Sequence, residues 1–344
     1  ACSLMLEGRM RRSSVSVQQG TFDTQELAGK VAVVTGAGNN GIGWGICKYA
    51  ADKLKMQVLI IDLHENLVQS AVYRLRSEFP GVVVEGMQCD VTKPEELQAA
   101  ARQVSISFPG RDIGAVFANA GVIFNKTIMN SALEHWRTTL DVNVMGVLHT
   151  IHAFVPLLQA QTSQSIFSTT ASVGGLVRGD GGAASYQASK HAVVAMTESL
   201  SFELAVKSPQ IRFHVLCPCI VGTALGETSR VNNLVKVGAM DEALVQVPES
   251  HTIGDLAQTP EDHAVQVFDH IAAGNFYMVT ENKRPYVDHD FPFDAEGIIR
   301  ERMEGVLKLQ LDNSDAFNSN QGRHASAILK GPLFQEIARR SSNK

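Results

Sequence analysis

A tyrosine and a lysine four positions apart are the residues of this chain best suited to acid–base chemistry. They begin and end the stretch Tyr186–Lys190 (YQASK). Residues at positions i and i+4 lie on one face of a helix, one turn apart. A phenol loses its proton near pH 10, and a fixed ammonium group beside it lowers that pKa. Such a tyrosine can exchange a proton with an alcohol or a ketone near neutral pH. The alternative is that the two side chains share a solvated helix face.

A glycine-rich stretch lies between an expected strand and an expected helix. The β-branched run Lys30–Thr35 predicts a buried parallel strand, and Gly36–Gly43 (GAGNNGIG) leads into a helical pattern that extends to about Lys55. In this context a GxGxxG-like pattern indicates a dinucleotide site, because glycines let the backbone approach a pyrophosphate and the helix N-terminus offers N–H groups to the anion. The alternative is an ordinary turn between a strand and a helix.

An acidic residue ends the next expected strand, Gln57–Asp62. Asp62 follows the glycine loop by about twenty residues, where a carboxylate can accept hydrogen bonds from the adenosine ribose and repel a 2′-phosphate. Neither the loop nor the positions directly after Asp62 hold a lysine or an arginine, so the sequence favours NAD over NADP. Asp62 as the N-cap of a helix that starts at Glu65 is the alternative.

Strand and helix patterns alternate along the rest of the chain. We expect strands at 81–89, 112–118, 165–169, 211–216 and 276–279, and helices at 65–78, 94–107, 132–160, 183–207 and 260–273. The helix over 132–160 should kink or end near Pro156. This alternation predicts an α/β fold: a Rossmann-like, doubly wound parallel sheet in three αβα layers. Cofactors bind such sheets at the carboxyl ends of the strands, where several polar residues fall: Asp62, Asp90, Asn119 and Ser172.

In this order and near these spacings, the motifs resemble those of the short-chain dehydrogenase/reductase family, over about Leu27–Val279. The resemblance implies an NAD-dependent alcohol dehydrogenase or carbonyl reductase. Its catalytic residues would be Asn143, Ser172, Tyr186 and Lys190. Its cofactor-binding residues would be Gly36, Asn39, Asn40, Gly41, Ile42, Gly43, Asp62, Leu63, Asp90, Val91, Asn119, Ala120, Gly121, Tyr186, Lys190, Pro218, Val221 and Thr223.

The resemblance also implies a role for each catalytic residue. Ser172 would polarise the substrate carbonyl, and Tyr186 would donate or accept the proton. Lys190 would keep the pKa of Tyr186 low and bind the nicotinamide ribose, while Asn143 would position a relay water. Ser172 could instead be a turn serine, and the hydroxyls of Thr169 and Thr170 compete with it.

Three features depart from the family pattern. The glycine loop has one extra residue, and Ser172 precedes Tyr186 by one position more than usual. Cys219 stands in place of the glycine that usually follows Pro218. Two other functions remain open: a catalytically idle NAD-binding redox sensor or assembly subunit, and a sugar-nucleotide epimerase. The second is disfavoured because the additional residues follow the last strand.

Composition excludes several partners and compartments. The net charge of −5 and the lack of a long basic run argue against nucleic acid. No apolar run reaches the roughly 18 residues of a membrane span. Five cysteines, with Cys217 and Cys219 as the only close pair, indicate a reduced intracellular protein without bound metal. The expected location is the cytosol, or an organelle if the basic leader is the remnant of a transit peptide.

The chain divides into three expected parts: a flexible leader (1–24), the NAD-binding catalytic domain (25–280) and a partly helical C-terminal extension (281–344). Within the domain, 224–259 matches the family's substrate lid, and its apolar residues suggest a hydrophobic alcohol or ketone. In the extension, Asp288-His289-Asp290 is interpreted as a solvated acidic turn rather than a metal site. The resemblance implies a homodimer or a homotetramer that pairs the helices over 132–160 and 183–207.

Overall fold

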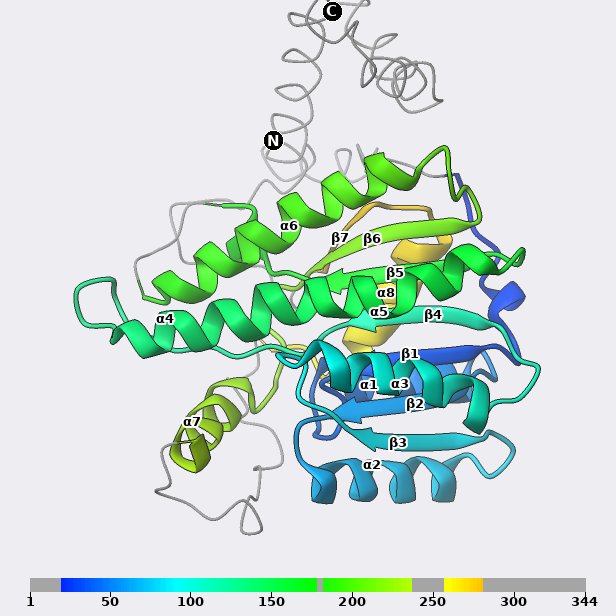
Figure 1. Cartoon of the computed structure of the whole chain (residues 1–344), viewed down its shortest axis with the longest axis horizontal. Helices are drawn as coiled ribbons and strands as arrows, with labels where there is room; N and C mark the ends of the chain where they lie inside the picture. The colour runs from blue at the N-terminus through cyan, green and yellow to red at the C-terminus, as the bar shows by residue number, and fades with distance from the viewer. Residues whose placement is uncertain (1–19, 178–181, 237–256, 281–344) are drawn as a thin grey trace, which may run out of the picture. The chain divides into compact units, whose positions relative to one another are not determined.

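The computed structural model of the chain describes residues 20–177, 182–236 and 257–280, all within one compact unit, Gln19–His289. A seven-stranded, fully parallel sheet forms its centre, in the order β3-β2-β1-β4-β5-β6-β7 (Figure 1). The strands are β1 (Val31–Thr35), β2 (Gln57–Asp62), β3 (Val84–Gln88), β4 (Ile113–Ala118), β5 (Ser165–Thr170), β6 (Ile211–Cys217) and β7 (Tyr277–Val279). This sheet confirms the predicted Rossmann-like, doubly wound fold. The predicted C-terminal extension lies outside the described residues.

Helices cover both faces of the sheet, as the alternating sequence pattern requires. They are α1 (Ile42–Asp52), α2 (Glu65–Glu78), α3 (Pro94–Ser107), α4 (Leu133–Leu140), α5 (Gly146–Ala160), α6 (Ala184–Leu204), α7 (Leu225–Lys236) and α8 (Pro260–Ala272). In Figure 1, α3, α5 and α6 lie in front of the sheet, while α1 and α8 pack on each other behind it. Because both faces are covered, the central strands contain continuous apolar runs whose side chains are buried.

Strand order locates the crevice in which such folds bind ligands. From β1 the chain builds the sheet towards β3, and then continues from β4 on the other side of β1. The connections therefore run in opposite directions from β1 and β4, and a crevice opens at the carboxyl ends of these two strands. The glycine loop follows β1, and Asn119 follows β4, so both predicted motifs lie at this crevice.

The long helix expected over 132–160 is interrupted at a different place from the one predicted. A π-helical turn, Asp141–Met145, separates α4 from α5, and α5 continues through Pro156 to Ala160. A proline inside a helix removes one N–H donor and leaves the carbonyl four residues earlier without its helical partner. Here the carbonyl of His152 accepts a hydrogen bond from the Gln98 side chain at 3.3 Å, which compensates for that loss.

The first described residues pack against the domain, although the sequence assigned 1–24 to a leader. Phe22 is buried, and its N–H donates to the carbonyl of Ala272 at 2.9 Å. The guanidinium group of Arg212 lies 5.1 Å from the centre of the Phe22 ring. The packed part of the chain therefore includes residues 20–24.

One helical run in the described part of the chain, Leu133–Ala160, is long and apolar enough to cross a membrane by those two measures alone. This run joins α4, the π-helical turn and α5. Of its most apolar window, 44% is buried inside the protein. Core helices of globular domains pass the same test, so this run is weak evidence for a membrane span.

Candidate active site

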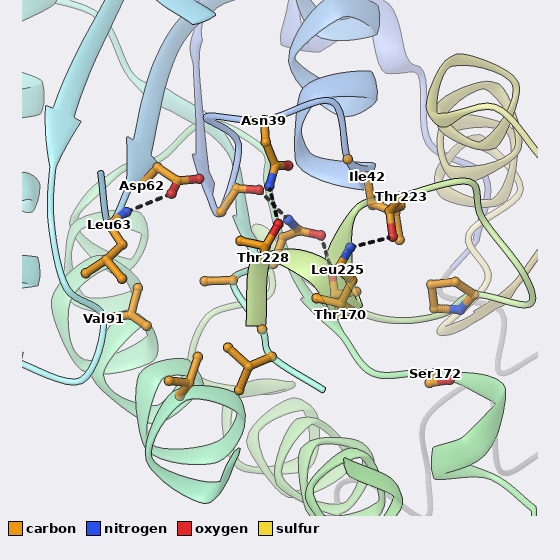
Figure 2. A pocket seen from close by; sticks show the side chains of 18 of the residues that line it. Asn39, Ile42, Asp62, Leu63, Val91, Thr170, Ser172, Thr223, Leu225 and Thr228 are labelled. Carbon is orange, nitrogen blue, oxygen red and sulfur yellow. Dashed lines mark hydrogen bonds between the residues drawn. The ribbon is translucent and has the colours of Figure 1, made fainter. Parts of the chain in front are cut away.

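A pocket at the carboxyl ends of β1 to β6 gathers most of the predicted site residues (Figure 2). The predicted residues that line it are Gly36, Asn39, Gly41, Ile42, Asp62, Leu63, Asp90, Val91, Asn119, Ala120, Gly121, Ser172, Tyr186, Lys190, Pro218, Val221 and Thr223. Asn40, Gly43 and Asn143 do not line it.

The glycine loop is shaped by close packing within the protein. Gly36 has a φ of +68°, which favours glycine, and a Cβ there would lie 2.7 Å from the Cα of Ala120. A Cβ on Gly43 would lie 2.6 Å from the carbonyl oxygen of Gly36. Gly41 is the N-cap of α1, and no side chain caps that helix end, which borders the pocket. An uncapped helix N-terminus beside a tight glycine turn fits the phosphates of a dinucleotide.

Asp62 lies at the end of β2 with both carboxylate oxygens facing backbone donors. Its Oδ2 accepts from the N–H of Gly38, and its Oδ1 from the N–H of Leu63, both at 2.8 Å. Burial raises the pKa of this carboxyl group, and backbone hydrogen bonds from Gly38, Leu63 and His64 act against that rise. Each carboxylate oxygen can accept more than one hydrogen bond. Asp62 can therefore still accept from ribose hydroxyls.

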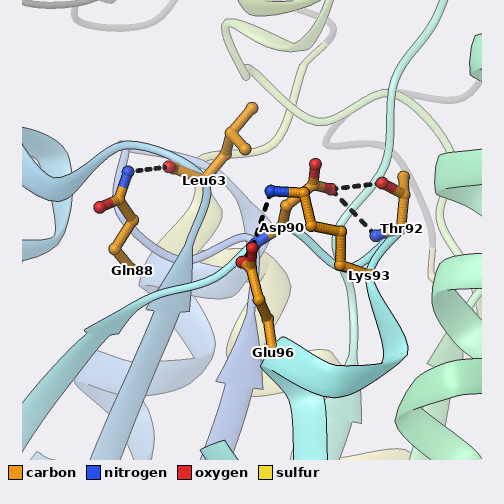
Figure 3. Close-up of polar contacts among 6 residues, drawn as sticks. All are labelled: Leu63, Gln88, Asp90, Thr92, Lys93 and Glu96. Atoms are coloured by element: carbon orange, nitrogen blue, oxygen red, sulfur yellow. Dashed lines mark hydrogen bonds and ion pairs between the residues drawn. The ribbon is translucent and has the colours of Figure 1, made fainter. Parts of the chain in front are cut away.

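Asp90 forms a turn at the end of β3 (Figure 3). Its Oδ1 accepts from the N–H of Thr92 at 2.9 Å and from the Thr92 hydroxyl at 2.8 Å. Its own N–H donates to Glu96 at 2.7 Å, and Lys93 pairs with the other oxygen of Glu96 at 2.8 Å. The side chain of Asp90 therefore shapes the pocket wall by fixing the start of α3.

Asn119 joins the ends of three strands. Its Nδ2 donates to the carbonyl oxygens of Thr35 and Gly36 at 3.0 and 3.2 Å, and its Oδ1 accepts from the Thr170 hydroxyl at 3.1 Å. The Thr35 hydroxyl in turn accepts from the N–H groups of Asn119 and Ala120. These bonds hold the glycine loop against the ends of β4 and β5, which fixes the floor of the crevice.

Three hydroxyl groups compete for the place beside Tyr186, and their contacts separate them. Thr169 is buried and bonds to the Thr197 hydroxyl at 2.7 Å, while Thr170 donates to Asn119. Ser172 is the residue whose side chain hydrogen-bonds to Tyr186. Its Oγ also accepts from the N–H of Gly174 at 3.1 Å, which fixes the side chain at the start of a short 3-10 turn.

Lys190 lies on the same helix face as Tyr186 and is buried beside it. Its Nζ is 5.4 Å from the centre of the Tyr186 ring and donates to the carbonyl oxygen of Thr170 at 2.7 Å. The side chain exposes only 4% of its surface, and this burial lowers the pKa of Lys190 to about 8. Tyr186, Ser172 and Lys190 therefore form one cluster that faces the pocket.

The pKa of Tyr186 shifts in the direction opposite to the one expected from sequence. Burial raises it, whereas the hydrogen bond with Ser172 lowers it by a smaller amount. The prediction that Lys190 lowers the pKa of Tyr186 rested only on the spacing of the two residues and left out their burial. Burial disfavours the charged form of both groups, so it raises the pKa of the phenol and lowers the pKa of the amine.

Asn143 lies behind the pocket, in the π-helical turn. Its Oδ1 accepts from the N–H of Val122 at 2.8 Å, and its Nδ2 donates to the carbonyl of Val122 at 3.0 Å and to the hydroxyl of Ser189 at 2.9 Å. Ser189 in turn donates to the carbonyl of Tyr186 at 2.6 Å. Asn143 therefore links the loop after β4 to the helix that carries Tyr186; its role in holding a relay water stays a prediction.

Several lining residues were not in the predicted set. They are Cys89, Val122, Val142, Thr170, Ala171, Cys219, Leu225, Thr228 and Asn232. The last three lie on α7, at positions i, i+3 and i+7 of one helix face. That spacing is present in the sequence and could have identified Thr228 and Asn232, although many residues of the lid are apolar.

Comparison with known proteins agrees with this geometry. The family model described as short chain dehydrogenase matches residues 30–233. A CLA biosynthesis dehydrogenase/reductase of Lactiplantibacillus plantarum is 30% identical over 204 residues, 59% of this chain and 69% of that protein. A 3-oxoacyl-[acyl-carrier-protein] reductase of Chlamydia muridarum is 29% identical over 57% of this chain and 76% of that protein. A structure of a short-chain dehydrogenase/reductase from Burkholderia phymatum in complex with NAD is 29% identical, with a TM-score of 0.65 over 82% of this chain and 96% of that one.

The doubly wound sheet, the glycine loop and the Ser–Tyr–Lys cluster define an α/β protein of the dinucleotide-dependent oxidoreductase class. Within that class, the chain belongs to the short-chain dehydrogenase/reductase family. This membership confirms the resemblance found in the sequence. Among the described residues no group of three metal-ligating side chains occurs, and the predicted turn around His289 lies outside them.

Proposed function

We propose that this protein transfers a hydride between NAD(H) and a secondary alcohol or ketone, with Tyr186 as the general acid and base. The observation that carries this proposal is the cluster of Tyr186, Ser172 and Lys190 in the pocket bordered by the glycine loop. A phenol, a hydroxyl that bonds to it and a buried amine are the groups needed to hold a carbonyl oxygen and exchange a proton with it.

NAD is the proposed cofactor, and it supplies the hydride. The carboxylate of Asp62 retains acceptor capacity for ribose hydroxyls and carries the charge that would repel a 2′-phosphate. The Burkholderia relative, whose structure holds NAD, supports the same choice. Gly41 and the uncapped start of α1 would receive the phosphates.

The side chains of this chain would then divide the chemistry among them. Ser172 and Tyr186 bond the substrate oxygen, and the phenol of Tyr186 gives it a proton during reduction and takes one during oxidation. Lys190 orients the ribose. A Cβ on Gly121 would lie 3.3 Å from Asn143 Oδ1 and 3.5 Å from Lys190 Nζ, so both polar atoms border that glycine.

The substrate would be apolar around its reacting carbon. Val122, Val142 and Leu225 line the pocket together with the half-exposed thiol of Cys219. Burying apolar substrate surface against such walls contributes roughly 25 cal/mol per Å². No disulfide joins the cysteines of the described residues, Cys47, Cys89, Cys217 and Cys219.

The decisive experiment compares Tyr186→Phe with the parent protein, in NADH binding and in turnover of a panel of secondary alcohols and ketones. Binding of NADH should be unchanged, whereas kcat should fall by about 100-fold or more, the usual contribution of a general acid or base. Equal loss of binding and turnover would count against this role for Tyr186. If the parent binds NADH and turns over no member of a broad panel, the idle cofactor-binding function is favoured instead.

We also propose that the protein is a homodimer or a homotetramer that pairs α4–α5 and α6 of neighbouring copies. Leu133, Leu140 and Met145 are exposed along α4 and the turn that follows it, at 73%, 38% and 39% of their surface. Burial of such residues against a second copy removes apolar surface from water. Sedimentation velocity of the full chain tests the assembly, and a monomer at micromolar concentration would contradict it.

A further inference from the structure

The helix α7 forms one wall of the pocket through a defined face. Leu225, Thr228 and Asn232 line the pocket, and Ser229 and Val231 beside them are buried. Arg230, in contrast, is exposed and pairs with Glu227 on the same helix. The polar residues on the pocket side hydrogen-bond to residues outside α7, and these contacts hold the helix against the rest of the protein.

Three side chains of α7 hydrogen-bond to three different segments of the crevice. The Ser229 hydroxyl accepts from the N–H of Ile123, after β4, at 2.9 Å. The Thr228 hydroxyl lies 3.5 Å from Nδ2 of Asn39 in the glycine loop (Figure 2). Asn232 Oδ1 lies 2.7 Å from Nε2 of His64, two residues beyond Asp62, so a proton on Nε2 makes His64 the donor.

These contacts extend along the whole crevice. The loop after β4 borders the half that holds Tyr186 and Lys190, whereas the turn after β2 borders the half that holds Asp62. His64 is buried, with only 2% of its surface exposed, whereas Asn232 is partly exposed, so the contact is partly shielded from competing water. At 2.7 Å it is the shortest of the three contacts, and it lies at the Asp62 end of the crevice.

We propose that the hydrogen bond between Asn232 and His64 is a latch that holds α7 over the Asp62 end of the crevice and slows the exchange of NAD(H). The bond joins two protein groups, so it resists opening whether the cofactor enters or leaves. A ligand shifts an equilibrium only by its differential affinity for the two states. Loss of the latch therefore changes both rates of exchange and leaves the affinity nearly the same.

The test uses Asn232→Ala in the full chain, with NADH association and dissociation followed by stopped-flow fluorescence. Both rate constants should rise by the same factor, about two- to tenfold, which corresponds to the ~0.5–1.5 kcal/mol net contribution of one hydrogen bond. The dissociation constant should stay within about twofold. His64→Ala should have the same effect, and the double variant should add nothing to either single one. His64→Gln, which keeps a donor, should restore slow exchange.

Arg230→Ala is the matched control, because it truncates the exposed face of the same helix and should leave both rates unchanged. Hydrogen exchange of the α7 amides gives a second readout, which should quicken in Asn232→Ala and not in the control. Unchanged rates in Asn232→Ala would overturn the proposal. Faster dissociation alone, with weaker affinity, would also overturn it, since that pattern means that Asn232 binds the cofactor directly. Both results are independent of substrate turnover, so they are separate from the test of the proposed reaction.

Discussion

Burial of Lys190 should make the free energy of unfolding depend on pH between about pH 8 and pH 10.5. The pKa of Lys190 falls from 10.5 to about 8 because the amine is buried. Between these two values the unfolded chain binds the proton and the folded chain does not, so stability rises as pH increases from about 8 to about 10.5. At 1.36 kcal/mol per pKa unit, the gain between about pH 7 and pH 9.5 is roughly 2 kcal/mol.

The assay is urea unfolding of the parent and of Lys190→Met at both pH values. The methionine retains most of the apolar length of the side chain and cannot titrate. The free energy of unfolding of the parent should rise by roughly 2 kcal/mol relative to the variant over this range. Lys207→Met, at an exposed position beyond the end of α6, is the control and should track the parent. A constant difference between the parent and Lys190→Met would refute the assignment of a lowered pKa to Lys190.

Two further substitutions follow from buried or charged groups. His263 is fully buried, neither ring nitrogen has a hydrogen-bond partner among the described residues, and burial lowers its pKa to about 4. The stability that its neutral form gives is lost as pH falls from about 6.5 towards 4. In urea unfolding, His263→Leu should therefore reduce the slope of the free energy of unfolding against pH over this range by up to ~1.4 kcal/mol per pH unit, and an unchanged slope would contradict the lowered pKa. Asp62→Ser removes the charge that repels a 2′-phosphate, and the preference for NADH over NADPH should fall at least about tenfold, or ~1.4 kcal/mol, in the ratio of dissociation constants.

Motif order and strand pattern were sufficient to predict the fold. The apolar runs of β1, β2 and β4 are fully buried because helices cover both faces, and that burial is what their composition indicates. The predicted interruption of the helix over 132–160 was wrong because it depends on tertiary contacts. Pro156 looked like a helix end, but Gln98 from α3 satisfies the freed carbonyl. The actual interruption, at Asp141–Met145, carries no breaker residue.

The site was less predictable because it depends on which partner each polar group finds. The sequence places Asp90 among the cofactor-binding residues, but only the structure shows that its Oδ1 is engaged with Thr92. Asn232 looked like one polar residue in an apolar lid, and only the fold brings it to His64, 168 positions earlier in the chain. The spacing of residues in the sequence predicts which side chains are neighbours on one helix. Contacts between distant segments can be identified only once the arrangement of the strands is known.

The Tyr186–Lys190 pair shows what spacing alone leaves undetermined. Position along a helix establishes that the phenol and the amine are neighbours, but the sign of each pKa shift depends on how much water surrounds them. Burial favours the neutral form of both groups, and only the hydrogen bond with Ser172 lowers the pKa of the phenol. At neutral pH the phenol is protonated with or without this shift, and a raised pKa makes it a weaker acid. In the proposed reaction the phenolate forms when a ketone is reduced and is required when an alcohol is oxidised, so both directions must overcome the desolvation that the fold imposes on Tyr186.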